Sequence, residues 1–290
     1  MSFSSTPMPG SPERRRVIPL RDSPRDAAAA VSRELLLHLH SPNAPQWPED
    51  ARKMLACACD GKPVDPAVFN RDAGGKTLQG VFDHMGVGRL PAVITSGGKG
   101  YLRLTGMGSD GAAIVTKSAA TIAQALSTYL DGCLFESKLS QTSIGIDVKG
   151  QKTNILYRIH NLCVTKKLDH YREIVNAAGG RPSLEDIEPL IVRAISRGLL
   201  SQAKTLDGTD DTRLEGLLPD DETLDIEILD GRPIFLPISD DGKGKMVTAL
   251  GVMNLVFSMN ANLTGPWYVG ALRARGYGLI RRNYEGKDKQ

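Results

Sequence analysis

The sequence has few cysteines, no long apolar run and no apolar segment near its first residue. Cys57 and Cys59 are separated by one residue, too close for a CxxC metal-binding knuckle, and Cys133 and Cys163 stand alone. No apolar run approaches the roughly 20 residues that a membrane-spanning helix needs. The Ser- and Pro-rich start lacks the hydrophobic core of a signal peptide. We therefore expect reduced thiols, no metal, no cofactor and no membrane contact, in a cytoplasmic protein.

What the chain has instead is an uneven distribution of charge. Its formal net charge is +3, but residues 205–241 hold twelve acidic residues against Arg213 and Arg232. That segment alone carries −10, so the rest of the chain carries +13. A surface with such an excess attracts polyanions, and contacts to phosphates make the binding sensitive to salt. The distribution indicates a nucleic-acid partner.

The first half of the chain alternates strand and helix patterns. Short apolar segments bounded by turn residues predict strands, and apolar residues at three-to-four spacing predict helices. The expected elements are, in order, a strand at 32–40, a helix at 48–59, strands at 91–95 and 100–105 about a turn at 96–99, a helix capped by Ser109 and ending near 130, and strands at 133–139 and 155–164. This order is the ferredoxin-like pattern of an α+β fold, in which helices cover one face of an antiparallel sheet.

The second half interrupts this rhythm with helices before strands return. Ser183 is placed to cap the second helix, and Pro189 marks a kink or a restart within it. Asp230 and Gly231 have the composition of a turn between two strands. The expected elements are helices at 168–178 and 183–203, and strands at 223–229, 234–238, 246–259 and 277–282.

Basic residues gather in two further places. Arg193 and Arg197 are four apart, and Lys204 lies seven beyond, so all three share one face of the predicted helix. That face suits RNA, although a solvated face with three cations is the plainer interpretation. Residues 1–31 contain Arg21 and a run of three arginines. They form either a disordered tail or a basic arm lying on nucleic acid.

The run from Leu263 to Ile280 combines glycine, arginine and aromatic residues. Glycines, among them Gly270, Gly276 and Gly278, let a backbone approach phosphates closely, and Arg273 and Arg275 supply charge beside them. A glycine-rich turn before an edge strand, with its aromatics in the core, explains the same composition. The motif alone does not separate the two interpretations.

These segments resemble the RAMP proteins of CRISPR systems. The glycine-rich run and the residues Gly97-Gly98-Lys99-Gly100-Tyr101 are similar to those of CRISPR repeat endoribonucleases. The strand Tyr157 to Leu162, leading to Lys166 and Lys167, resembles that family's approach to its RNA-binding helix. The helical insertion is similar to the finger of the type IV branch, which is where we place the chain.

The resemblance implies two ferredoxin-like domains in tandem with an inserted helical finger. Under it, residues 1–31 are a flexible basic arm, 32–150 the first domain, and 151–290 the second, with the finger at about 167–205. The implied partner is the hairpin of a CRISPR repeat transcript, which the protein cleaves and then retains as crRNA, together with other CRISPR effector subunits. The alternatives are a non-catalytic RAMP subunit that holds crRNA, and a plasmid-borne DNA-binding protein.

The resemblance also implies cleavage without metal, in which the 2′-OH attacks the adjacent phosphate and leaves a cyclic phosphate. A base must accept the hydroxyl proton, and histidine suits this near neutral pH. His84 is the nearest match to the family's histidine, since the first helix contains none. Tyr101 or a lysine is the substitute base, and Lys99 and Arg103 are placed to stabilise charge. We expect RNA contacts from Arg103, Lys166 and Lys167 as well.

Overall fold

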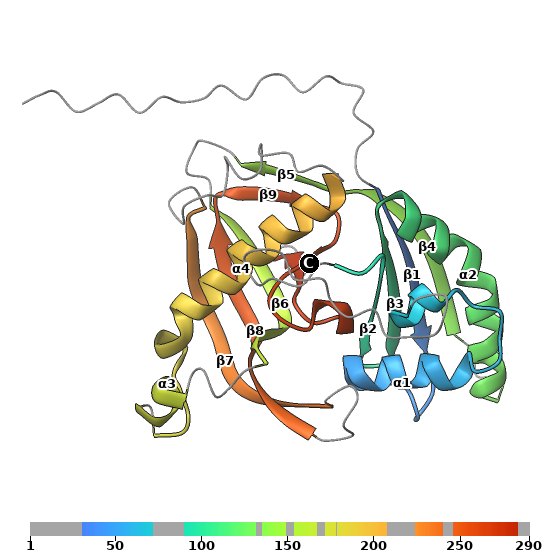
Figure 1. Cartoon of the computed structure of the whole chain (residues 1–290), viewed down its shortest axis with the longest axis horizontal. Helices are drawn as coiled ribbons and strands as arrows, with labels where there is room; N and C mark the ends of the chain where they lie inside the picture. The colour runs from blue at the N-terminus through green and yellow to red at the C-terminus, as the bar shows by residue number, and fades with distance from the viewer. Residues whose placement is uncertain are drawn as a thin grey trace, which may run out of the picture.

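Two antiparallel sheets, each covered by helices on one face, organise the chain (Figure 1). The computed structural model describes residues 31–71, 90–131, 135–148, 154–166, 172–177, 179–207, 224–239 and 246–283. The predicted basic arm with Arg21, the segment with His84, and Lys167 lie outside the described residues.

The first sheet has the strand order β2-β3-β1-β4, the order of a ferredoxin-like domain. Leu35, Leu37 and Leu39 alternate along β1 and face the helices, where Leu55 and Leu126 complete the core. The elements are β1 (Val31–Leu39), α1 (Pro48–Ala58), the 3-10 helix η1 (Pro66–Phe69), β2 (Val93–Gly98), β3 (Tyr101–Met107), α2 (Gly108–Tyr129) and β4 (Phe135–Ser143). The predicted order of strands and helices is confirmed here.

Two details of this half were predicted wrongly. The hairpin turn lies at Lys99 and Gly100, which both have positive φ, because Gly97 still pairs with Leu102 in the sheet. Ser109 does not cap α2, because the helix begins directly at the end of β3, and Met107 occupies the capping position without a side-chain hydrogen bond.

The second sheet has the order β10-β11-β6-β8-β7, in which β11-β6-β8-β7 repeats the arrangement of the first sheet. The helix α4 lies across this sheet (Figure 1) and packs on it through Ile187, Ile191, Ile195 and Leu199, all fully buried. The elements are β6 (Ile155–Thr165), α3 (Arg172–Ala177), α4 (Leu184–Asp207), β7 (Ile226–Ser239), β8 (Met246–Met259), β10 (Trp267–Tyr268), the 3-10 helix η3 (Arg273–Arg275) and β11 (Leu279–Arg282). The predicted tandem α+β fold is present.

The start of α4 is capped as predicted. The Ser183 Oγ accepts a hydrogen bond from the Asp186 N–H at 3.2 Å, and the Asp186 carboxylate accepts one from the Ser183 N–H at 2.7 Å. The Ser183 hydroxyl also donates to the Asp186 carboxylate at 2.8 Å, and the two hydrogen bonds that this carboxylate accepts from Ser183 lower the pKa of Asp186. The helix then runs through Pro189 without a restart, so that alternative was wrong.

The predicted turn at Asp230 and Gly231 was also wrong. One strand, β7, runs through both residues, and its register with β8 shifts on either side of Asp230. The Asp230 carboxylate accepts a hydrogen bond from the Gly231 N–H at 2.7 Å, so a short polar side chain supports a bulge here instead of a turn. Further along β7, the outermost strand of the described sheet, Pro233 and Pro237 stay paired with Val252 and Thr248 of β8.

The two sheets contact each other where β2 and β3 of the first meet η3 and β10 of the second. The hydroxyls of Thr105 and Tyr268 lie 2.9 Å apart in this buried contact. A further two-stranded sheet joins β5 (Gly145–Val148) to β9 (Ala261–Thr264). The strand β5 precedes the predicted domain boundary at residue 150 but pairs with β9 of the second half. The position of that boundary stays a prediction. No helix in the described part of the chain is long and apolar enough to cross a membrane.

Candidate nucleic-acid interface

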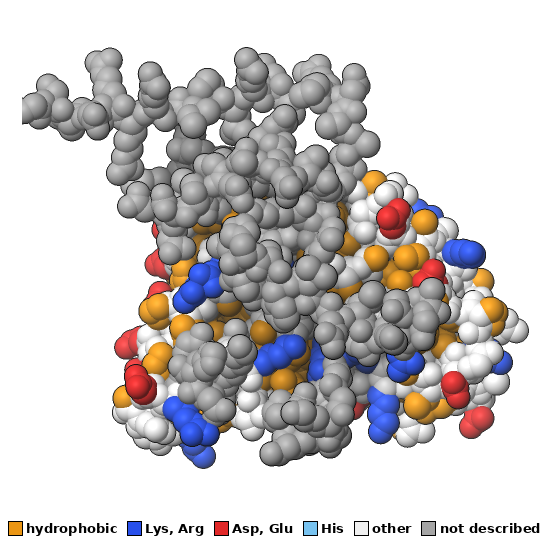
Figure 2. Space-filling model, in the orientation of Figure 1, with side chains coloured by type: hydrophobic (Ala, Val, Ile, Leu, Met, Phe, Trp, Pro, Cys, Tyr) orange, Lys and Arg blue, Asp and Glu red, His pale blue; other side chains and the backbone are white. Residues whose placement is uncertain are grey.

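The exposed surface of α4 carries the predicted arginine pair. Arg193 is exposed, and Arg197, one turn further on, is half-buried. Lys166 is exposed just beyond the end of β6, while the side chain of Lys204 lies outside the described residues. Figure 2 shows Lys and Arg side chains across the lower and middle part of this face, with the acidic side chains mostly toward its two edges. Arg193 therefore offers an exposed cation on α4.

The segment 269–278, here called the glycine loop, is held against α4. The N–H of Gly270 donates to the carbonyl of Ala194 at 3.2 Å. The guanidinium of Arg273 donates to the carbonyl of Gly198 and to the hydroxyl of Ser201, each at 3.2 Å. Arg273 is 5% exposed. Its guanidinium thus binds the helix, and the predicted contact with phosphate stays a prediction.

Close packing within the protein explains why the glycine loop contains glycine. Gly276 has a φ of +81°, and a Cβ there would overlap the side chain of Ser96 on β2. Gly270 has a φ of +76°, and a Cβ there would lie 2.5 Å from the carbonyl oxygen of Cys163. Gly278 is left-handed as well and lies against the backbone of Val269. An L side chain at Gly270 or Gly276 would be strained and obstructed, so these positions serve packing whatever their role toward RNA.

Glu49 on α1 lies between two arginines from different parts of the chain. Its Oε1 lies 3.1 Å from Nη1 of Arg275, and its Oε2 lies 3.7 Å from Nη1 of Arg52. Arg275 is 6% exposed, whereas the Glu49 side chain is partly open to solvent. Arg273 therefore attaches η3 to α4, and Arg275 attaches it to α1. Like Arg273, Arg275 binds protein here, and its predicted phosphate contact stays a prediction.

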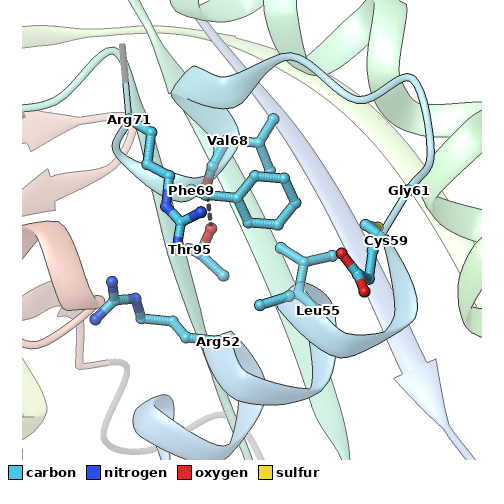
Figure 3. Close-up of a pocket in the computed structure, with 10 residues that line it drawn as sticks. Arg52, Leu55, Cys59, Gly61, Val68, Phe69, Arg71 and Thr95 are labelled. Atoms are coloured by element: carbon cyan, nitrogen blue, oxygen red, sulfur yellow. Dashed lines mark hydrogen bonds between the residues drawn. The ribbon is translucent and has the colours of Figure 1, made fainter. Parts of the chain in front are cut away.

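A pocket of about 300 Å³ opens beside Arg52, between α1, η1 and β2. Figure 3 shows the Phe69 ring and the Leu55 side chain pointing toward one another across it, with Arg52 and Arg71 on the same side. The Thr95 hydroxyl donates to the carbonyl of Val68 at 3.1 Å and so fixes η1 against β2. The lining residues are Arg52, Leu55, Ala56, Cys59, Asp60, Gly61, Val68, Phe69, Arg71 and Thr95.

The face of the first sheet that points away from its helices carries a second basic cluster. The guanidinium of Arg103 lies 5.7 Å from the centre of the Tyr101 ring and 3.4 Å from a carboxylate oxygen of Glu34. The pKa of Arg281 is lowered by desolvation and then by the nearby charge of Arg103. Lys99 is exposed at the tip of the β2–β3 hairpin. One carboxylate therefore faces two guanidinium groups, which leaves this cluster positive.

None of the histidines in the described residues lines the pocket. His38 and His40 are exposed on and just after β1, and the Nδ1 of exposed His160 lies 2.7 Å from the side-chain oxygen of Asn254. His84 lies outside the described residues, so its predicted catalytic role stays a prediction. Within the same described part, no group of three or more His, Cys, Asp or Glu could hold a metal ion.

The prediction from sequence did not find Glu49, Arg52, Phe69 or Arg71. Glu49 lies in the first turn of α1, where an acidic residue is common, so nothing in the sequence marked it as special. Arg52, Phe69 and Arg71 belong to no motif, and they line one pocket because η1 packs beside α1 and β2. The only indication in the sequence was an aromatic residue two positions before an arginine.

The fold and the basic surfaces define a nucleic-acid-binding protein of the tandem ferredoxin-like class. Residues 32–284 match the model of the family described as type IV CRISPR-associated endonuclease Csf5, and the chain belongs to this family. The predicted resemblance, including its type IV branch, is therefore confirmed. No curated protein matches the chain.

Solved structures share the fold at low sequence identity. A structure described as Csf5, a type IV Cas6 crRNA endonuclease, is 18% identical with a TM-score of 0.62, and the match covers 88% of this chain and all of that one. A crystal structure of Cas6b is 13% identical with a TM-score of 0.55 and the same coverage. A Cas6b RNA-processing endoribonuclease is 12% identical with a TM-score of 0.50, over 87% of this chain and all of that one. Family and fold together make this chain a CRISPR-associated RNA endonuclease of the Cas6 type.

Proposed function

We propose that the chain cleaves the hairpin of a CRISPR repeat transcript without a metal ion and retains the product. One observation carries the proposal: Arg273 and Arg275, two residues apart in η3, bind α4 and α1 respectively. The short helix η3 therefore fixes the position of the basic surface of α4 relative to the arginine-lined pocket beside α1. A hairpin bound on α4 can therefore present its flanking strand to the pocket.

The RNA contacts follow from the charges on this face. Arg193, Arg197 and Lys166 bind the phosphates of the hairpin, and Arg103 and Arg281 bind the flanking strand. Protein side chains do not fit the intact major groove of A-form RNA, so α4 engages the backbone and the distorted end of the stem. Lys167, Lys204 and Arg21 remain proposed contacts whose side chains lie outside the described residues.

In the chemical step, the ribose 2′-oxygen attacks the adjacent phosphorus. The bond from the 2′-oxygen to phosphorus forms and the bond to the 5′-oxygen breaks, which leaves a 2′,3′-cyclic phosphate and a 5′-hydroxyl. A base accepts the proton of the 2′-OH, and the leaving oxygen takes up a proton. Arg52 and Arg71 stabilise the charge of the phosphorane, and His84 is the proposed base. Tyr101 and Lys99, at and beside the hairpin tip, are the alternative proton-transfer groups.

The test is to incubate purified protein with end-labelled repeat RNA in EDTA. A single cut with a cyclic-phosphate end is the expected result. His84→Ala should abolish cutting and spare binding, while Arg52→Ala with Arg71→Ala should slow cutting more than it weakens binding. No cut in EDTA, with cutting restored by a divalent cation, would show that cleavage requires a metal ion.

A second candidate function is a non-catalytic subunit that holds crRNA. It differs from the proposed function in leaving the bound RNA intact. Tight binding of intact RNA under all ionic conditions is its expected result. Other CRISPR effector subunits are proposed partners in either case, and the exposed side chains of Leu229 and Phe235 on β7 give them an apolar contact surface.

A further inference from the structure

We infer that the pocket between α1, η1 and β2 receives one unpaired nucleotide of the RNA, with its base between Phe69 and Leu55 and its phosphate on Arg52 and Arg71. This inference rests on the proposed function, because it takes RNA as the ligand. It adds a base-binding subsite outside the hairpin, formed by residues that no motif predicted.

The size and lining of the pocket suit a single nucleoside. Its volume is about 300 Å³, at the lower end of the range for small-molecule sites. Leu55 and Val68 are buried in the core of the first domain, and Phe69 packs against that core while remaining half-open. A half-open ring on a fixed apolar base is the arrangement on which an unpaired base stacks.

The charge of the rim suits the phosphate that accompanies the base. Arg71 is exposed beside the pocket, and Arg52 lies on the same side (Figure 3). Glu49 is 3.7 Å from Arg52 but closer to Arg275, at 3.1 Å, so its single negative charge is shared between two cations. The charged residues of the pocket lining are Arg52, Arg71 and Asp60, so the lining carries more positive than negative charge and attracts an anion.

The hydrogen-bond acceptors in the lining suggest which bases fit. Asp60 is an exposed lining residue, and an ionised carboxylate only accepts hydrogen bonds. The Thr95 hydroxyl already donates its hydrogen to the Val68 carbonyl, so toward a ligand its oxygen also acts as an acceptor. Two acceptors favour a base with an exocyclic amino group, adenine or cytosine, over uracil.

The nucleotide must be unpaired because the pocket is closed on the sides formed by α1 and η1. A base in an A-form duplex exposes only its edges. A base that lies between Phe69 and Leu55 has both of its faces in contact with the protein, so it cannot be stacked in a duplex. The occupant therefore comes from the single strand beside the hairpin. The same arginines then serve the scissile phosphate only if the cut lies next to this nucleotide.

The test scans the unpaired strand with abasic nucleotides. Equilibrium binding is measured for wild type and Phe69→Ala with repeat hairpins that carry one abasic substitution at each flanking position in turn. At one position the abasic RNA should bind wild type about 5- to 100-fold more weakly, the range for one stacked base. Phe69→Ala should bind the unmodified RNA more weakly by a similar factor and show no further loss at that position. Uracil in place of adenine or cytosine there should weaken binding to wild type but not to Asp60→Asn.

Two further variants keep this test decisive. Phe69→Leu preserves the apolar filling and removes the ring, so it should show the same loss with an unchanged unfolding temperature. Tyr129→Ala removes an exposed aromatic side chain at the end of α2 and should reproduce the wild-type profile. An abasic profile that is identical in wild type and both Phe69 variants would overturn the inference. A wild-type protein that ignores the hairpin altogether would overturn the proposed function instead.

Discussion

Glu49 of α1 and Arg275 of η3 form an ion pair, with 3.1 Å between Oε1 and Nη1, that joins the two ferredoxin-like halves. The arginine is buried and the carboxylate is partly open to solvent. The pair therefore gives the buried guanidinium a counter-charge at the contact between the halves. Loss of this ion pair should weaken the docking of the two halves. Any function that needs residues from both halves should then be impaired.

Glu49→Gln tests this pair. The substitution removes the Glu49 counter-charge from the buried Arg275 guanidinium, and a hydrogen bond to a charged group contributes about 1.5–3 kcal/mol. We expect the free energy of unfolding in urea to fall by roughly that amount. Lys53→Ala, an exposed change on the same helix, should alter it by less than about 0.5 kcal/mol. Equal effects of the two variants would show that the pair does not stabilise the docked halves.

Gly276→Ala tests the close approach of the glycine loop to β2. A left-handed φ and the overlap with Ser96 together should cost about 2 kcal/mol or more. We expect a lower unfolding temperature and loss of RNA cleavage. Gly145→Ala is the matched control, because no atom lies within 4 Å of its added Cβ. An unchanged unfolding temperature for Gly276→Ala would contradict the close packing of the loop.

Arg193→Ala combined with Arg197→Ala tests the RNA surface of α4. Each phosphate contact contributes about 0.7–0.9 to the slope of log K against log salt. The double variant should therefore bind more weakly at moderate salt, with a slope reduced by roughly 1.5. Lys117→Ala removes an exposed cation from α2, far from α4 in Figure 1, and should leave the slope unchanged. A double variant with the wild-type slope would remove α4 from the interface.

Cys163 predicts a dependence of stability on alkaline pH. Burial raises the pKa of its thiol from an ordinary value near 9 to about 12, against the opposing charges of Lys166 and Arg275. Between these values the unfolded chain loses this proton and the folded chain keeps it, so stability falls as pH rises from 9 to 12, by roughly 1 kcal/mol per pH unit. Cys163→Ala should be less sensitive in that window, which denaturant unfolding at several pH values will measure. Parallel pH curves for the two proteins would contradict the burial of an uncharged thiol.

Elements with strong periodic patterns were predictable from the sequence. The short apolar segment at 32–40, bounded by turn residues, predicted β1, and the helical pattern at 183–203 with Ser183 as its cap predicted α4. Local hydrophobic pattern decides these segments, and their order was sufficient to predict the fold.

The failures share a different cause, which is that tertiary pairing overrides local chemistry. Asp230-Gly231 has the composition of a turn, yet pairing with β8 on both sides keeps the strand continuous. Gly97 likewise has the composition of a turn residue, yet pairing with Leu102 keeps it in β2. The pocket was not predictable, because Arg52 and Arg71 are brought together by long-range folding alone.

The two prolines of β7 have a consequence for self-association. β7 is the outermost strand of its described sheet. Pro233 and Pro237 are four residues apart on this strand, so both face the same side of it. Prolines in edge strands turn their missing N–H groups away from the neighbouring strand. A second chain that tried to extend the sheet would therefore find acceptors without the matching donors, and fibril-like stacking of copies along this edge is disfavoured.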